Sequence, residues 1–173
     1  EHRVENTRWC VLRYPSHSMA TLAEKSQDDF EDFFFKVCNL DSSKLAGYMS
    51  KLKKLMEKTH KIQITGPGTD ITFSIEGIPV IQCDGKINIP DGEVFTAPVK
   101  ESVNGTILYN TPCMRDSNIY NNIRLEFKDG KIIKASCQGD QKKLDEIFSV
   151  DEGARYVGEF AIGVNPFVLD PMK

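Results

Sequence analysis

Two glutamates are the clearest candidates for chemistry, because each follows a glycine and leads into an apolar run. Glu93 follows Pro90-Asp91-Gly92 in NIPDGEVFTAP, and Glu159 follows Gly158 in VGEFAIG. A glutamate next to a buried strand is costly to keep ionised unless a cation or hydrogen bonds replace its lost hydration. The pattern is therefore compatible with a pair of exposed strand ends, with a metal-binding pair, or with an acid and a base that work without metal.

Other catalytic patterns have weaker support in the sequence. The three histidines, His2, His17 and His60, all lie within the first 60 residues, and no GxSxG motif occurs. A serine or cysteine nucleophile needs a base beside it, so a triad is disfavoured. The stretch GPGTD at residues 66–70 lacks the GK[ST] ending of a phosphate-binding loop and precedes a strand-like TFSI, which favours a turn between strands.

Two helices are predicted in the first 60 residues. Ser26 with Asp29 forms a capping pattern, and an apolar stripe follows at Phe30, Phe33, Phe34, Val37 and Leu40. The second helix starts at about Ser42 behind Asp41, and its apolar side comprises Leu45, Tyr48, Met49, Leu52, Leu55 and Met56. WCVLRYP, residues 9–15, favours a short strand that ends at a proline.

The sequence becomes β-rich after Thr59. KIQITGPG, TDITFSIEG and IPVIQCDGKINIP alternate apolar and polar residues between glycine and proline turns. Asp129-Gly130 suits a two-residue hairpin turn, Asn104-Gly105 is a second turn candidate, and a helix is expected from Asp140. The fold class predicted is α+β (mixed α/β), with residues 1–60 ending an α/β domain and residues 61–173 forming a β-rich portion.

Composition narrows the class of protein. With 40% apolar and 27% charged residues, the 173-residue chain is expected to fold, and its net charge of −3 disfavours nucleic-acid binding. No run of eighteen apolar residues and no secretion signal occurs, so we expect a cytoplasmic protein without a membrane span. Five scattered cysteines without a CxxC pair are interpreted as reduced, mostly buried thiols.

Several motifs in the same order resemble a known family. NIPDGEVFTAPV followed by SVNGTI, then RLEFKDGKI and DEGARYVGEFAIGVNP, are similar to the thermophilic-type metallo-aminopeptidases, which include aminopeptidase T, aminopeptidase S and PepS. TGPGTDITFSI and WCVLRYP also fit that pattern, so the resemblance covers nearly all of the chain.

The resemblance implies a function and a set of ligands. Glu93 and Glu159 would be metal ligands in a centre of two divalent ions (zinc, cobalt or manganese) that releases N-terminal residues from peptides with a free N-terminus. Glu159 would bridge the ions. The family's histidine ligands, in HLA-type and HxD-type motifs, and its active-site tyrosine have no counterpart in this sequence. We therefore expect a central fragment that is inactive by itself, derived from a homodimeric cytoplasmic enzyme whose metal-binding peptidase domain contributes residues 61–173.

Two other functions remain open at this point. The chain could be a non-catalytic module that keeps the fold without the metal cluster. It could also be a different hydrolase, in which Glu93 and Glu159 act as acid and base and activity survives a chelator. A full metal centre uses carboxylates to bridge the ions and imidazoles to complete their coordination, which two glutamates alone do not supply.

Overall fold

The chain forms two compact units that interleave along the sequence. The computed structural model describes residues 2–169, and the described parts of unit 1 are residues 2–56, 80–95 and 161–169. Unit 2 contains residues 57–79 and 96–160. These units differ from the single boundary near residue 60 that the sequence predicts. The assignment of 1–60 and 61–173 to two domains of a longer protein stays a prediction.

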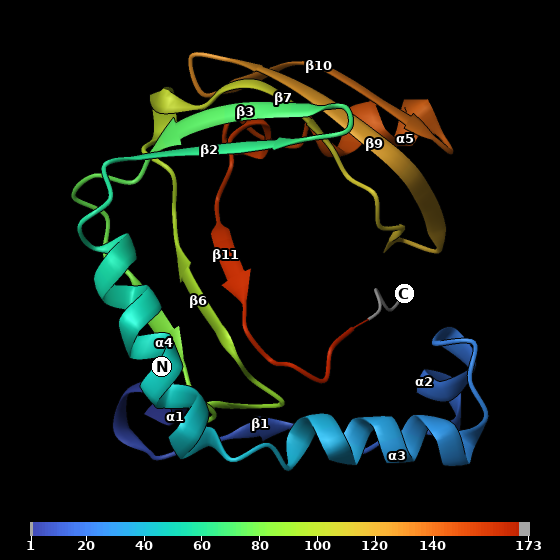
Figure 1. Ribbon diagram of the computed structural model, residues 1–173. Coiled ribbons are helices and arrows are strands. Elements are labelled where there is room, and N and C mark those ends of the chain that lie inside the picture. Colours follow the sequence, from blue (N-terminus) through green and yellow to red (C-terminus); the bar gives the residue numbers. More distant parts are fainter. Residues whose placement is uncertain (1, 170–173) are drawn as a thin grey trace. The chain divides into compact units, whose positions relative to one another are not determined.

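Unit 1 combines helices with short strands. Its helices are α1 (His2–Asn6), α2 (His17–Leu22), α3 (Gln27–Cys38) and α4 (Ser42–Met56). Its strands are β1 (Val11–Leu12), β4 (Ile81–Cys83), β5 (Asn88–Ile89), and the larger parts of β6 (Glu93–Thr96) and β11 (Phe160–Gly163). β1 pairs with β5 in parallel, and β11, β6 and β4 form a three-stranded sheet in that order, with β6 and β11 side by side in Figure 1.

The two predicted helices of unit 1 are confirmed, with one difference in their packing. The Ser26 hydroxyl accepts the Asp29 backbone N–H at 3.1 Å, and Phe30 and Phe34 pack with Ala20 of α2 in a small core. α4 buries Leu45, Met49 and Met56, whereas Tyr48 and Leu55 are 70% and 64% exposed. α2 is not among the predicted elements, because its six residues are too few to show a helical period.

Unit 2 is built around a single sheet. Its strands are β2 (Lys61–Gly66), β3 (Thr69–Ser74), β7 (Asn104–Leu108), β8 (Cys113–Arg115), β9 (Asn118–Lys128) and β10 (Lys131–Gln138). The sheet runs β10-β9-β7-β3-β2 with antiparallel neighbours, and β8 pairs with β9. Figure 1 shows β2, β3, β7, β9 and β10 side by side. Two 3₁₀ helices, Lys100–Ser102 and Gly153–Arg155, and α5 (Gln141–Ile147) complete the unit.

The sheet buries alternate residues, as the sequence period requires. Ile71 and Phe73 on β3 are 3% and 5% exposed, and Leu125 and Phe127 on β9 are similarly buried. α5 begins behind Asp140, whose carboxylate accepts the Lys143 backbone N–H at 3.1 Å. The α+β prediction is confirmed.

One of the two predicted turns is confirmed and the other is wrong. Asp129 and Gly130 connect β9 to β10 with φ values of 47° and 83°, the two positive values that a primed hairpin turn requires. Asn104 and Gly105 instead begin β7. Gly105 is needed there for a different reason: a Cβ would lie 2.2 Å from the carbonyl oxygen of Asp70 on the neighbouring strand.

The cysteines are less buried than predicted. All five are free, Cys10 and Cys113 are exposed, and the other three are half-buried. The exposed ones lie at Cys10, just before the short strand β1, and at Cys113, the first residue of β8, where few residues cover them.

Within residues 2–169, no helix has both the length and the apolar character needed to cross a bilayer.

The hairpin turn gives a stability prediction. Replacing Gly130 by Ala should destabilise the chain by about 1–3 kcal/mol, because φ is positive and the new Cβ would lie 1.9 Å from the Lys100 carbonyl oxygen. Urea denaturation followed by circular dichroism measures this loss. Gly66→Ala is the matched control, since open space surrounds that position, and it should change stability by less than about 0.5 kcal/mol. Equal midpoints for the two variants would contradict the prediction.

Candidate functional site

Glu93 is the first residue of β6 and is half-buried. Its backbone pairs with Cys83 on β4 in antiparallel register. The next residues alternate as a strand should: Val94 is fully buried and Phe95 is half-buried. The register of β6 therefore directs Glu93 to the face of the sheet opposite Val94, on a backbone that a neighbouring strand holds in place.

The turn before Glu93 is fixed by its own side chain and backbone. The Asp91 carboxylate accepts the backbone N–H of Gly85 at 2.9 Å and that of Gly92 at 3.1 Å. The Gly92 N–H also donates to the Cys83 carbonyl at 3.1 Å. Gly92 has φ +123°, where a side chain is strained, and a Cβ would lie 3.1 Å from that of Asn165. Asp91 therefore orders the turn that leads into Glu93.

Asn165 connects this turn to two other segments of unit 1. Its amide group donates to the carbonyl oxygen of Asp91 at 3.2 Å and to that of Val37, at the end of α3, at 3.4 Å. Its side-chain oxygen accepts the Phe167 backbone N–H at 3.1 Å. Next to it, the Val164 N–H donates to the Gly92 carbonyl at 2.8 Å. The residues after β11 thus hold the Asp91-Gly92 turn against α3.

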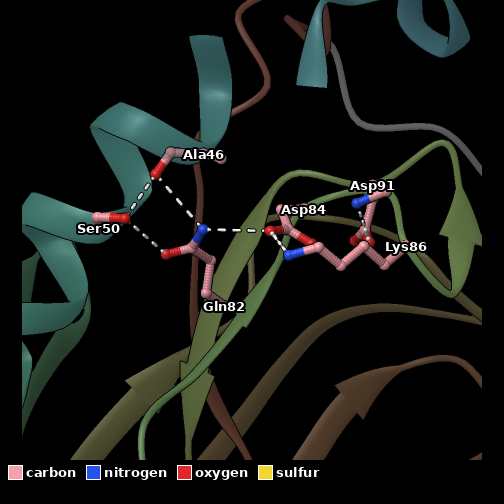
Figure 2. A network of polar contacts seen from close by, with 7 residues as sticks. Ala46, Ser50, Gln82, Asp84, Lys86 and Asp91 are labelled. Atoms are coloured by element: carbon pink, nitrogen blue, oxygen red, sulfur yellow. Dashed lines mark hydrogen bonds and ion pairs between the residues drawn. The ribbon is translucent and has the colours of Figure 1, made fainter. Parts of the chain in front are cut away.

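A polar network supports β4 and the loop after it. The Gln82 side chain accepts from the Ser50 hydroxyl at 3.3 Å, and its amide group donates to the Ala46 carbonyl and to Asp84, each at 3.4 Å (Figure 2). Lys86 pairs with Asp84 at 2.6 Å. The hydrogen bond between Ser50 and Gln82 therefore connects α4 to β4, the strand that pairs with Glu93 on β6.

Glu93 lines a hollow of about 520 Å³ within unit 1. The other residues that line it come from three segments: Val37; Asn88, Pro90, Asp91 and Gly92; Gly163, Asn165 and Val168. Two carboxylates line the hollow, those of Asp91 and Glu93, and both oxygens of Asp91 accept backbone N–H groups of the turn. A ligand in this hollow would meet Glu93 and the amide of Asn88.

Glu159 lies in unit 2 and is exposed, directly before β11. The apolar run that follows it was predicted to be buried, and this prediction is wrong. Phe160 and Ile162 are half-buried while Ala161 and Gly163 are exposed, because β11 is a four-residue edge strand with a neighbour on one side only. Since Glu93 and Glu159 belong to different units, their pairing stays a prediction.

The described residues do not by themselves provide a complete metal site. Among residues 2–169, no group of three or more histidine, cysteine, aspartate or glutamate side chains is placed to hold an ion. His60 pairs with Glu76 at 3.0 Å in unit 2, and His17 begins α2 outside the Glu93 hollow. Two carboxylates alone leave most of the coordination positions of zinc, cobalt or manganese without a protein ligand.

Two ionisable groups near α3 and α4 have shifted pKa values. Burial raises the pKa of the Cys38 thiol, which therefore stays protonated above the pH at which a solvated thiol ionises. The pKa of Asp41 is lowered, first by the hydrogen bond from the Ser43 hydroxyl and then by the Lys44 backbone N–H. Asp41 is the helix cap that the sequence predicts, because its carboxylate accepts the backbone N–H groups of Ser43 and Lys44.

Sequence reasoning found Glu93 but missed the residues that hold it. Asp91 carried a usable signal, because aspartate before glycine often bonds the backbone one or two residues on. Asn165 looked like a strand terminator in NP, and its bonds to Val37 and Asp91 bridge 128 and 74 positions. Such contacts leave no local pattern.

Comparison with known proteins decides the family. The sequence profile described as "Thermophilic metalloprotease (M29)" matches residues 1–168, nearly the whole chain. The chain belongs to the thermophilic metalloprotease (M29) family. The resemblance found in the sequence motifs is thereby confirmed, and M29 proteins are metallopeptidases.

Curated M29 relatives match at moderate identity. The chain is 39% identical over 75 residues to Aminopeptidase 2 of Geobacillus stearothermophilus, covering 43% of the chain and 18% of the relative. It is 32% identical over 104 residues to Aminopeptidase AmpS of Bacillus subtilis, covering 55% and 25%. With Aminopeptidase T of Thermus aquaticus, 29% identity extends over 65% of the chain and 30% of the relative. The chain thus spans less than a third of these relatives.

Two solved structures share the fold. Wild-type AmpT from Thermus thermophilus superposes with a TM-score of 0.73 at 24% identity, over 79% of this chain and 38% of that one. The 2,5-dihydroxypyridine dioxygenase from Pseudomonas putida KT2440 gives a TM-score of 0.61 at 15% identity, over 80% and 43%. At these identities the likeness concerns the M29 fold alone.

The role of Asn165 gives a prediction on local stability. Replacing it by Ala should make the Val164 amide exchange with solvent roughly tenfold faster, because bonds worth about 1–2 kcal/mol that hold the neighbouring segment are lost. Hydrogen exchange read by NMR measures this rate. Asn110→Ala, at an exposed asparagine of unit 2, is the control and should leave the rate unchanged. An unchanged rate in the Asn165 variant would show that the segment is held by other contacts.

Proposed function

We propose that this chain is the part of an M29 aminopeptidase that contributes two glutamate ligands, Glu93 and Glu159, to a centre of two divalent metal ions. The observation that carries the proposal is the setting of Glu93. It is a half-buried carboxylate at the start of a paired strand, facing a hollow of about 520 Å³. Preorganised ligands of this kind bind metal without first paying to order their own backbone.

The motif around Glu159 supports its inclusion in the same centre. GEF at residues 158–160 repeats the glycine-glutamate-apolar order of GEV at 92–94. Glu159 is exposed and so is available to a ligand. The bridging role for Glu159 belongs to this proposal.

The named relatives favour peptide hydrolysis over oxygen chemistry. One structure with this fold is a dioxygenase and another is an aminopeptidase, so the fold is compatible with both reactions. The sequence profile and the curated relatives are all peptidases by name. We therefore assign peptides with a free N-terminus as substrates.

The chain by itself is proposed to be inactive. The described residues offer carboxylates but no cluster of three or more metal-binding side chains, so metal should bind weakly and without fixed geometry. The isolated chain would then behave like a non-catalytic module that keeps the fold without the metal cluster, which is the alternative function raised by the sequence. The full enzyme would be cytoplasmic and a homodimer, as the family resemblance implies. The exposed Tyr48 and Leu55, seven residues apart on α4, are surface of the kind that a subunit contact covers.

A comparison of two proteins tests the activity. The 173-residue chain, supplied with zinc, cobalt or manganese, should release no p-nitroaniline from leucine p-nitroanilide, because its donor set is incomplete. The product of the whole reading frame that contains this sequence should cleave it and should stop when a chelator is added. Equal rates for the two proteins would refute the proposal about the missing ligands. Activity that survives the chelator would favour the metal-free acid and base.

Single substitutions in that longer protein test the two glutamates. Glu93→Gln and Glu159→Gln should each lower metal affinity by at least about a hundredfold, since loss of an outer-shell partner alone already costs roughly tenfold to a hundredfold. Glu101→Gln, at an exposed glutamate of unit 2, is the matched control and should bind metal normally. Competition with a metal-sensitive dye measures the affinity. Normal binding by either site variant would remove that residue from the centre.

A further inference from the structure

A second hollow lies beside the one that contains Glu93, and its walls are apolar. Its volume is about 330 Å³. One side is formed by α2 and α3, through Met19, Phe30, Phe33 and Phe34, and the other by the short strands β1 and β5. All of these residues belong to unit 1. Aromatic and thioether side chains make this a site for an apolar group of moderate size.

The two hollows adjoin. Val37, Asn88, Pro90 and Val168 line both of them, so one group of residues separates the Glu93 carboxylate from the aromatic wall. Pro90 and Glu93 lie on the same Pro-Asp-Gly-Glu stretch, whose turn is held by Asp91. Because the hollows share these residues, a ligand held at Glu93 lies next to the hollow that Phe33 lines.

We propose that the apolar hollow is the subsite that receives the first side chain of the peptide, and that it selects large uncharged apolar side chains such as leucine, methionine or phenylalanine. This inference rests on the proposed function, since it assumes that the peptide bond to be cleaved lies next to Glu93. Glycine would leave the hollow empty, and a lysine ammonium would lose its hydration against the phenylalanine rings.

One charged residue refines the choice of ligand. Arg13 also lines the apolar hollow, and because it is exposed its guanidinium stays hydrated. An acidic side chain that reached Arg13 would be the alternative ligand. Apolar residues, the phenylalanines and Met19 among them, form the larger part of the wall, which favours the apolar side chain over the acidic one.

The experiment uses the methionine methyl groups of the 173-residue chain as reporters. Met19 lines the hollow, whereas Met114 is exposed on β8 of unit 2 and serves as the internal control. The probes are leucinamide, glycinamide and the α-amide of glutamate, titrated into protein with ¹³C-labelled methionine methyls. Leucinamide should shift the Met19 signal, with an affinity at least about tenfold above that of glycinamide, and should leave Met114 unchanged.

Three variants locate the binding. Phe33→Ala should weaken leucinamide binding by about tenfold, because it removes part of the aromatic wall. Phe35→Ala is the matched control, since Phe35 lies on the same helix, is 39% exposed and does not line the hollow. Val168→Trp should also weaken binding by filling the hollow, and its 48% exposure makes it a change that the core tolerates.

Several results would overturn the inference. They are a Met19 shift that is the same for leucinamide and glycinamide, tighter binding of the glutamate amide, or a shift unaffected by Phe33→Ala and Val168→Trp. A Met19 signal that moves with protein concentration alone would show that a second copy of the chain occupies the hollow. Selective leucinamide binding together with a whole protein that lacks peptidase activity would keep the apolar site and reject the proposed function.

Discussion

The backbone of Gly92 is held from two sides by segments that are distant in the sequence, and the position of Glu93 depends on this. Its N–H donates to the Cys83 carbonyl, and its carbonyl accepts the Val164 N–H. The Asp91 side chain bonds Gly85, and Asn165 bonds the Asp91 carbonyl. A carboxylate that follows such a turn loses little further freedom when it binds a ligand, which is why stiff frames are typical of metal and catalytic sites.

Glycine is required at residue 92 by geometry as well as by space. Its φ of +123° lies outside the range that side chains adopt readily, and a Cβ would press on Asn165 and Leu45 at 3.1 and 3.2 Å. Close approach of three segments at one glycine brings the end of α3, the start of α4 and the residues after β11 around the same turn. The end of α3 and the residues after β11 also line the hollow beside Glu93.

The same fold carries more than one chemistry in solved proteins. AmpT and a dihydroxypyridine dioxygenase both superpose on this chain with TM-scores above 0.6. The reaction must therefore be set by the ligands and side chains placed on the fold. In unit 1, one hollow presents the Glu93 carboxylate, and the adjoining hollow presents phenylalanine rings.

The sequence alone determined the elements whose apolar period, capping residues or turn residues lie within a few positions of each other. The stripe from Phe30 to Val37, the Asp140 cap and the Asp129-Gly130 turn were all predictable, because each depends on residues within a few positions. The motif order was enough to indicate the M29 family and to single out Glu93. Tertiary structure alone decided that Asn104-Gly105 continues a strand and that β11 is a poorly buried edge. It also decided that Asn165 holds the turn before Glu93, since contacts across tens of residues depend on how the whole chain packs.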